Sequence, residues 1–306
     1  MKSGTVAVVG KANAGKSTLI NVLVGEKVAI VSPKPQTTRD RILGVLTTEN
    51  YQIVFEDTPG FYKSRTELGK KMQKTAYKVA KDVDVILFVL DAHEGVKEED
   101  LEFLKRVKND ETPLIVAMSK IDIMPKENIP ECLVKITSEV DVDEIIPISS
   151  RKNKNIKNLL DILLKYIGEG DKIFKEDIIS DKSEKFMISE IMREKILLEF
   201  DKEIPHGIAV VINEFYKKPN GVYEINLDII CEKQNHKAIL IGKSGSAIKK
   251  VSSYARESME KFLNAKVFLT TYVKVKEDWR MKENYLSEYG YGDKEDNLWE
   301  CATRKT

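Results

Sequence analysis

Residues 5–17 read Thr5-Val-Ala-Val-Val-Gly-Lys-Ala-Asn-Ala-Gly-Lys-Ser17, and this stretch decides the fold of the N-terminal part of the chain. The apolar run at its start predicts a buried strand, and the apolar spacing after Ser17 predicts a helix. A strand, a Gly-x-x-x-x-Gly-Lys-Ser loop and a helix in this order form the context of a phosphate-binding loop. Backbone N–H groups of such a loop surround phosphate oxygens, while Lys16 reaches the β- and γ-phosphates and Ser17 ligates Mg²⁺. The alternative is a glycine-rich turn without a ligand.

A second polar motif, Asp57-Thr-Pro-Gly60, follows the apolar strand predicted over residues 51–56. A carboxylate at Asp57 can hold Mg²⁺ through water, and Gly60 leaves a backbone N–H free to approach a γ-phosphate. The motif therefore predicts a metal-binding position and a phosphate-sensing position beside the phosphate-binding loop.

Two more motifs predict a base-recognition site. Ser119-Lys-Ile-Asp122 follows another apolar strand, and Asp122 can accept hydrogen bonds from both guanine N1–H and the 2-amino group, a pattern that adenine does not offer. Ser149-Ser-Arg151 follows the next strand and can offer a backbone N–H to guanine O6. In this order and spacing, the four motifs resemble the G motifs of a small GTPase. The predicted nucleotide-binding residues are Gly10, Asn13, Ala14, Gly15, Lys16, Ser17, Thr18, Asp57, Gly60, Ser119, Lys120, Asp122, Ser149, Ser150 and Arg151.

Composition limits the class of protein. A chain of 306 residues is long enough for about two domains, each with its own core. Lys and Arg total 50 against 49 Asp and Glu, so the overall charge favours neither nucleic acid nor membrane, and any such site must be local. The 3 cysteines lack the spacing of a zinc site or a disulfide framework, which suits a reducing cytoplasm. No signal peptide is expected, and the longest apolar run, near residues 85–90, is too short to span a bilayer.

Strand-like runs alternate with helical patterns up to about Gly168, which predicts an α/β domain with a mostly parallel sheet covered by helices on both faces. A short turn separates two of the strands, 41–47 and 51–56, so this pair should be an antiparallel hairpin at one edge. The predicted strands are 5–9, 41–47, 51–56, 84–90, 113–118 and 144–148, and the predicted helices are 16–24, 67–80, 97–109, 126–139 and 155–167. The predicted domains are residues 1–168, which carry the G motifs, a linker over 169–183, and a second domain over 184–306.

The second domain follows a different pattern. A helix is predicted over 184–200, strands over 207–212 and 223–230, two helices on either side of a Gly-x-x-Gly turn, and a last strand over 266–275. This α+β order resembles a type II KH domain, whose turn clamps the backbone of about four single-stranded nucleotides. No Asp or Glu occurs from Lys233 to Arg256, although several Lys residues do; the alternative is a solvated helix face. The predicted RNA-binding residues are Gly242, Lys243, Ser244, Gly245, Lys249 and Lys250.

A GTPase domain followed by a KH domain resembles the Era family of ribosome-assembly GTPases, and the resemblance covers nearly the whole chain. The stretches 32–39, 186–195 and 203–208 also look like that family. The resemblance implies GTP hydrolysis to GDP, coupled to binding of the 3′ end region of 16S ribosomal RNA during maturation of the 30S subunit. It also implies a switch I threonine at Thr37 or Thr38, with Thr38 favoured as the Mg²⁺ ligand. The expected catalytic residues are then Lys16, Thr38 and Gly60, and the expected Mg²⁺ ligands are Ser17, Thr38 and Asp57.

Several positions depart from the pattern of that family. Ala12 stands where proline is usual, and Ser150 replaces an alanine whose contact comes from the backbone. Ser119 replaces asparagine, which predicts a weaker link between the base site and the phosphate loop. Apart from these departures, the residue after Gly60 is Phe61, not a glutamine able to orient water, so slow intrinsic hydrolysis is expected. Asn13 resembles the marker of GTPases that use K⁺, although it can also simply cap the loop.

Two rival functions stay open at this point. One is a nucleotide-regulated RNA-binding scaffold with little turnover, motivated by Phe61 and Ser119. The other is a membrane-acting GTPase of dynamin type, which no amphipathic basic helix supports. A cytoplasmic monomer is expected, with peripheral association at the inner face of the cell membrane as a further expectation. The aromatic residues from Trp279 to Tyr291 are predicted to pack either against the second domain or against RNA.

Overall fold

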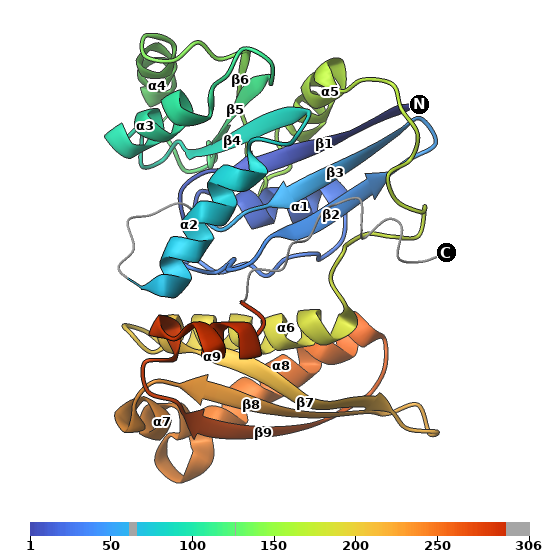
Figure 1. The fold of residues 1–306 in the computed structure, drawn as a ribbon, viewed down its shortest axis with the longest axis vertical. Coiled ribbons are helices and arrows are strands. Elements are labelled where there is room, and N and C mark those ends of the chain that lie inside the picture. The colour runs from blue at the N-terminus through green and yellow to red at the C-terminus, as the bar shows by residue number, and fades with distance from the viewer. Residues whose placement is uncertain (61–65, 126, 292–306) are drawn as a thin grey trace.

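The computed structural model describes residues 1–60, 66–125 and 127–291 of the chain. These residues form two β-sheets, one six-stranded and one three-stranded, each with its own helices and its own buried core (Figure 1). The elements of the N-terminal part are β1 (Lys2–Val9), α1 (Lys16–Val24), β2 (Ile42–Thr47), β3 (Tyr51–Asp57), α2 (Glu67–Val79), β4 (Val85–Asp91), α3 (Glu98–Val107), β5 (Leu114–Ser119), α4 (Asn128–Thr137), β6 (Glu144–Pro147) and α5 (Ile156–Tyr166).

The N-terminal sheet has the order β2-β3-β1-β4-β5-β6. All of its pairs are parallel except β2 with β3, which form an antiparallel hairpin at the edge. The predicted α/β fold and the predicted hairpin are therefore confirmed. The first strand begins at Lys2, earlier than the predicted Thr5, because residues 2–4 pair with residues 51–53 of β3. That pairing joins distant parts of the chain, and the local apolar pattern does not reveal it.

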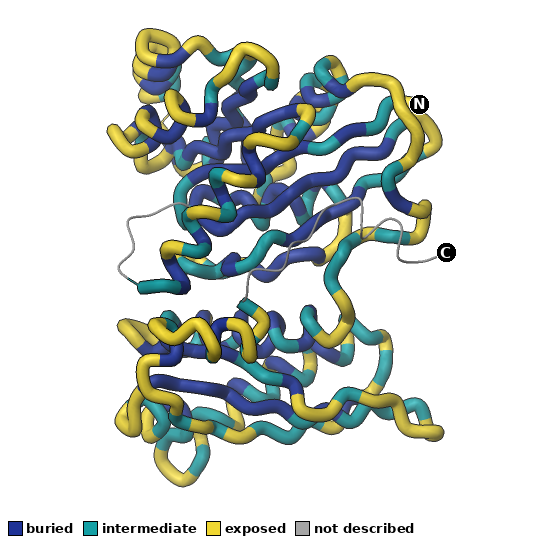
Figure 2. Tube along the Cα trace, in the orientation of Figure 1, coloured by how far each residue is buried: buried dark blue, intermediate teal, exposed yellow. Residues whose placement is uncertain are grey.

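Side chains of a strand point alternately to the two faces of its sheet, and helices cover both faces of this one. The strands in the middle of the sheet are accordingly buried along most of their length (Figure 2). Val6 and Val8 join the buried cluster with α1 and α5, whereas Ala7 and Val9 join the cluster with α3 and α4. Because both faces are buried, the central strands are apolar at successive positions. Each fully buried Val or Leu stabilises the fold by roughly 1.5–3 kcal/mol.

The C-terminal part builds a three-stranded sheet backed by helices. Its elements are α6 (Glu184–Glu199), η1 (Pro205–Gly207), β7 (Ala209–Lys217), β8 (Tyr223–Cys231), α7 (Gln234–Ile241), η2 (Lys243–Gly245), α8 (Ser246–Leu263), β9 (Val267–Val275), η3 (Trp279–Met281) and α9 (Glu283–Glu288). Strand β7 pairs antiparallel with β8, which pairs parallel with β9. Apolar residues of one sheet face pack against α6 and α8 to form the core of this part.

Strand β7 differs from its prediction over residues 207–212. Gly207 belongs to the short 3₁₀ turn η1, and the strand continues to Lys217. The register with β8 shifts between Ile212 and Glu214, so Asn213 is a bulged residue. A bulge breaks the period-two alternation of side chains, which is the signal that the sequence prediction relied on.

The aromatic residues that follow β9 pack against the C-terminal sheet. Trp279 is fully buried, and its Nε1 donates to the Gly207 carbonyl at 2.9 Å. The rings of Tyr289 and Tyr291 lie 5.6 and 5.8 Å from that of Trp279, centroid to centroid. Of the two predicted roles for this segment, packing against its own domain is the one that these contacts support. The predicted domain extends to residue 306, and its last part, 292–306, lies outside the described residues.

The connecting segment over residues 169–183 runs along the outer edge of the sheet, beside β2. The Val45 N–H donates to the Ile179 carbonyl at 2.9 Å, and the Leu43 N–H donates to the Asp181 carboxylate at 2.8 Å. The Gln52 side chain donates to the Phe174 carbonyl and accepts from the Phe174 N–H. Although this segment lacks periodicity, it is bonded to the sheet along its length.

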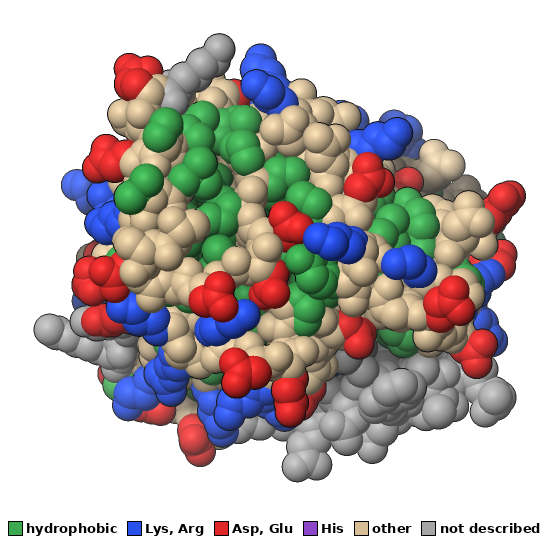
Figure 3. Space-filling model, turned by 90° about the horizontal axis from the view of Figure 1, so that it is seen from above, with side chains coloured by type: hydrophobic (Ala, Val, Ile, Leu, Met, Phe, Trp, Pro, Cys, Tyr) green, Lys and Arg blue, Asp and Glu red, His purple; other side chains and the backbone are tan. Residues whose placement is uncertain are grey.

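The end of the molecule seen from above carries a patch of apolar side chains on the α4 side, while acidic and basic side chains are interspersed over the rest of that face (Figure 3). Ile123, in the loop before α4, and Val134, on α4, are 52% and 66% exposed. Within the part of the chain that the structure describes, no helix has both the length and the apolar character needed to cross a membrane.

Candidate functional site

The loop between β1 and α1 ends at Gly15, which has a φ of 99° and caps the first turn of α1. Lys16 follows with only 5% of its surface exposed, and its ammonium donates to the carbonyls of Gly10 at 3.0 Å and Lys11 at 2.8 Å. Burial lowers the pKa of Lys16 to about 8, opposed by the nearby Asp57 carboxylate. The loop therefore holds a buried cation at the N-terminus of a helix, where phosphate oxygens bind readily.

The three predicted Mg²⁺ ligands lie together. The hydroxyl of Ser17 is 2.8 Å from that of Thr38 and donates to Asp57 Oδ2 at 2.7 Å, and Thr38 donates to the same oxygen at 3.3 Å. The other carboxylate oxygen, Oδ1, is buried with no hydrogen-bond partner among the described residues. Burial raises the pKa of Asp57 to about 6, opposed by Lys16 and by the two hydroxyls. Hard oxygen donors grouped in this way fit Mg²⁺.

Gly60 lies against the phosphate-binding loop. A Cβ at this position would sit 2.5 Å from both the N and the Cα of Ala12, so only glycine allows this approach. The close contact brings the backbone of the second motif beside the first, as a γ-phosphate sensor requires. The next residue, Phe61, lies outside the described residues.

The base-recognition motifs also converge. The Ser149 hydroxyl donates to Asp122 Oδ1 at 2.7 Å, and the Ile121 N–H donates to the Ile148 carbonyl at 3.3 Å. Lys120 has a φ of 61° and forms an ion pair with Asp91 at the end of β4. These contacts tie the loop after β5 to the loop after β6, which orients the exposed Asp122 carboxylate.

Ser119 makes the link that its replacement of asparagine was expected to weaken. Its hydroxyl is almost fully buried and lies 2.6 Å from the Ala14 carbonyl and 2.9 Å from the Leu90 carbonyl, to which it can donate. The base motif is therefore bonded directly to the phosphate-binding loop. The remaining predicted residues lie in the same region: Asn13 in the loop with a φ of 65°, Thr18 in the first turn of α1, and Ser150 and Arg151 in the turn after β6.

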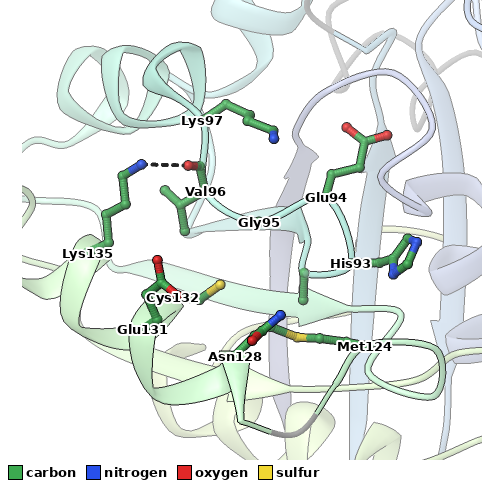
Figure 4. Close-up of a pocket in the computed structure, with 11 residues that line it drawn as sticks. His93, Glu94, Gly95, Val96, Lys97, Met124, Asn128, Glu131, Cys132 and Lys135 are labelled. Carbon is green, nitrogen blue, oxygen red and sulfur yellow. Dashed lines mark hydrogen bonds between the residues drawn. The ribbon is translucent and has the colours of Figure 1, made fainter.

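A cavity of about 270 Å³ lies beside the base motif, between the loop after β4 and helix α4 (Figure 4). Met124 and Cys132 line it from one side, and His93 and Lys97 from the other; the Lys135 ammonium donates to the Val96 carbonyl at 2.8 Å. None of the predicted nucleotide-binding residues lines this cavity.

The Gly-x-x-Gly turn joins α7 to α8. Gly242 has a φ of 73°, and a Cβ there would lie 2.7 Å from that of Ala247, so a larger residue would not fit. Lys243 and Ser244 are exposed at the tip of the turn, and Lys249 is exposed in the first turns of α8. Lys250 forms an ion pair with Glu199 at 2.6 Å, and both side chains are solvent-accessible.

Two arginines that the sequence analysis did not single out join the two sheets. Arg193 on α6 is buried beside Glu190 and donates to the carbonyls of Gln36, at 3.2 Å, and Thr37. Arg39 is also buried, and its guanidinium lies 5.8 Å from the ring centroid of Trp279 and 5.7 Å from that of Tyr291. The sequence signals for these contacts are that Arg39 immediately follows the threonine motif, and that both arginines lie in the stretches 32–39 and 186–195, which look like the Era family.

Comparison with known proteins places these features in a family. Residues 5–120 match the family model described as 50S ribosome-binding GTPase, and residues 203–280 match the KH domain model. The chain is 46% identical over 291 residues to GTPase Era of Clostridium kluyveri, covering 95% of this chain and 99% of that protein. GTPase Era of Clostridium botulinum strain Hall is 46% identical over 290 residues, covering 95% and 98%.

Two solved structures agree with the described fold over both sheets. A variant of Era from Aquifex aeolicus bound to GDP.AlF4- has a TM-score of 0.92 and 40% identity, covering 95% of this chain and 100% of that one. Era in complex with MgGDPNP and nucleotides 1506-1542 of 16S ribosomal RNA also has a TM-score of 0.92, with 41% identity and coverage of 95% and 99%. The chain therefore belongs to the Era family of GTPases, with a GTPase domain followed by a KH domain.

Proposed function

We propose that this GTPase hydrolyses GTP at the site formed by Lys16, Ser17, Thr38, Asp57 and Gly60. Mg²⁺, when bound, neutralises charge that develops on the phosphates. Ser17, Thr38 and Asp57 supply oxygen ligands for it, Lys16 binds the β/γ-phosphate oxygens, and the Gly60 N–H faces the γ-phosphate. The cluster of these three oxygens around the buried Asp57 carboxylate is the observation that supports this assignment.

Guanine selection is assigned to the loops after β5 and β6. The Asp122 carboxylate accepts from the base, and the backbone of Ser150 and Arg151 donates to it. Ser119 and Lys120 support this loop through their contacts with Ala14 and Asp91. Asn13, which resembles the marker of K⁺-dependent GTPases, is assigned to K⁺ binding. Phosphate release in K⁺ and in Na⁺ tests that assignment, because Asn13→Ala should erase any difference between the salts.

The second activity is binding of the 3′ end region of 16S ribosomal RNA through the KH domain, in support of 30S maturation. The exposed turn of Gly242, Lys243, Ser244 and Gly245 at the N-terminus of α8 supports it, together with the complex of a relative with nucleotides 1506-1542 of that RNA. We further propose a cytoplasmic monomer, with peripheral membrane association as a separate question for liposome flotation. The domains are assigned as 1–168, 169–183 and 184–306.

Crosslinking of the GTP-bound protein to total RNA, followed by sequencing of the bound fragments, tests the RNA assignment. Fragments from the 3′ end of 16S ribosomal RNA are expected. The enzymatic assignment is tested separately with Lys16→Ala, which should abolish multiple-turnover phosphate release without changing the melting curve. Retained turnover in a folded Lys16→Ala protein would contradict the assigned site.

A further inference from the structure

One face of the KH sheet packs on helices, and the other is partly bare. Ile225, Leu227 and Ile229 of β8 belong to the core with α6 and α8. Because side chains alternate along a strand, the intervening residues Glu224 and Asn226 point to the opposite face. Figure 1 looks onto this opposite face, where the three strands lie in front of α8.

The register of the strands places three exposed aromatic residues on this face. Tyr216, Glu224 and Phe268 form one row across the sheet, and Glu214, Asn226 and Thr270 form the next. Tyr216, Phe268 and Tyr272 are 48%, 59% and 53% exposed. We define the aromatic sheet face as Glu214, Tyr216, Glu224, Asn226, Phe268, Thr270 and Tyr272.

Among the described residues, the C-terminal segment up to Tyr291 covers the neighbouring end of this sheet. Trp279 and Leu286 pack there with Ala209 and Ile230. The three rings of the aromatic sheet face lie beyond that cover and are about half exposed. Clustered exposed aromatic residues are typical of protein-binding surfaces, where Tyr and other large side chains contribute much of the binding energy.

The charges of this face favour a partner that donates hydrogen bonds. The outward-facing charged residues of the three strands are Glu214, Glu224, Asp228 and Lys274. Lys274 pairs with Asp228 at 2.6 Å, and Glu224 pairs with Lys218 from the adjoining turn. Glu214 forms no ion pair within the described part of the chain. The buried Oδ1 atom of Asn226 accepts no hydrogen bond from the described residues. The three carboxylates therefore outnumber the single ammonium among these outward-facing charged side chains.

We propose that the aromatic sheet face docks an arginine-rich segment of a partner protein. The planar guanidinium of arginine stacks on aromatic rings and donates to carboxylates at the same time, whereas the ammonium of lysine does so less well. RNA fits this face poorly, because phosphate would meet Glu214 and Glu224. The exposed lysine of the Gly-x-x-Gly turn belongs to the α7–α8 side of the domain instead. The proposal is independent of the RNA-binding function.

Fluorescence anisotropy with a labelled twelve-residue peptide of alternating Arg and Gly tests this proposal on the full chain. The double substitution Phe268→Ala and Tyr272→Ala should weaken binding about tenfold, and Glu214→Gln should weaken it several-fold. The matched control is Tyr254→Ala, because Tyr254 on α8 is 47% exposed and lies outside this face. The same peptide with Lys in place of Arg should bind the wild-type protein more weakly.

Equal peptide affinity in the double variant and the Tyr254→Ala control would overturn the proposal, as would no binding to the wild type. Loss of oligo(U) binding in the double variant would overturn it too, because the face would then bind RNA. Photocrosslinking of the peptide to the wild-type protein gives a readout that needs no substitution. Crosslinks on β7 and β9 are expected, and crosslinks confined to the G domain would contradict the assignment.

Discussion

The guanidinium of Arg39 lies beside the stacked rings of Trp279 and Tyr291, at 5.8 and 5.7 Å from their centroids. Arg39 also donates to the His206 carbonyl at 2.9 Å and to the Ile208 carbonyl. Since Arg39 directly follows Thr38, the KH domain holds the segment that places this threonine beside Ser17. The position of Thr38, the proposed Mg²⁺ ligand, and the docking of the KH domain are thus physically joined.

Arg39→Lys is therefore expected to lower affinity for a GTP analogue several-fold while changing GDP affinity little. Lysine keeps the charge but loses the planar stacking and the second carbonyl contact. Titration with fluorescent GDPNP and GDP measures the two affinities. The matched control is Arg106→Lys, because Arg106 stacks on Tyr77 at 4.0 Å far from the nucleotide loops. An equal change for both nucleotides would argue against a link between Thr38 and the KH domain.

Asp122→Asn should shift base preference from guanine toward xanthine by a factor of 100 or more, on the order of 3 kcal/mol. The 2-oxo group of xanthine needs a donor, which the asparagine amide supplies. Ser149 can still donate to the remaining oxygen, so the loop should keep its structure. Competition binding of GTP, XTP and ATP measures the preference. If wild-type protein bound ATP as tightly as GTP, the base site would be assigned wrongly.

Ser119→Ala should weaken GTP and GDP binding alike, by about 1–3 kcal/mol, because the Ala14 and Leu90 carbonyls lose a buried donor. Ser119→Asn restores a donor and should recover most of the loss. Ser150→Ala is the control, since the predicted contact of Ser150 comes from its backbone. Calorimetric titration measures the affinity of each variant for GTP and GDP. Unchanged affinity in Ser119→Ala would mean that the hydrogen bonds of Ser119 do not contribute to nucleotide binding.

Changing Lys243 and Ser244 together to Asp should weaken single-stranded RNA binding and flatten its salt dependence. The two carboxylates would repel phosphate at an exposed turn, while stability should change by less than about 0.5 kcal/mol. GTP binding should stay the same. Asn220→Asp, in the exposed β7–β8 turn, adds a carboxylate elsewhere in the same domain and serves as control. Wild-type RNA affinity in the double variant would mean that the turn is only a helix junction.

Glu56 on β3 should make the free energy of unfolding fall as pH rises. Burial raises its pKa from an ordinary value of 4.5 to about 7, opposed by Arg41. Between these two values the unfolded carboxyl has lost its proton and the folded one has kept it, so rising pH favours unfolding. The loss is on the order of 2–3 kcal/mol between pH 4.5 and 7. Glu56→Gln should flatten this slope in denaturant titrations, whereas Glu49→Gln, on an exposed turn, should leave it.

The nucleotide loops could be predicted from the sequence because each motif is short, contiguous and adjacent to a strand. The residue types within 10–17 and 119–122 determine the local backbone conformation of each loop. In the structure, the hydrogen bond of Ser119 to the Ala14 carbonyl joins the two loops. The contact of Arg193 with Thr37 could not be predicted, since it joins residues 156 positions apart and has no periodicity. The bulge at Asn213 and helix α9 were not predicted either, because tertiary packing and not the local sequence pattern determines them.

The pairing of residues 174–181 with β2 and β3 has a consequence for aggregation. Strand β2 is at the edge of its sheet, and an unpaired edge is a template for association with other chains. Ile179 and Asp181 bond the backbone of that edge at Val45 and Leu43. A fragment ending at residue 168 would expose these groups and should self-associate. A fragment that continues through Lys182 keeps the segment that covers the edge of β2. The connecting segment therefore also prevents association of this edge with other chains during folding.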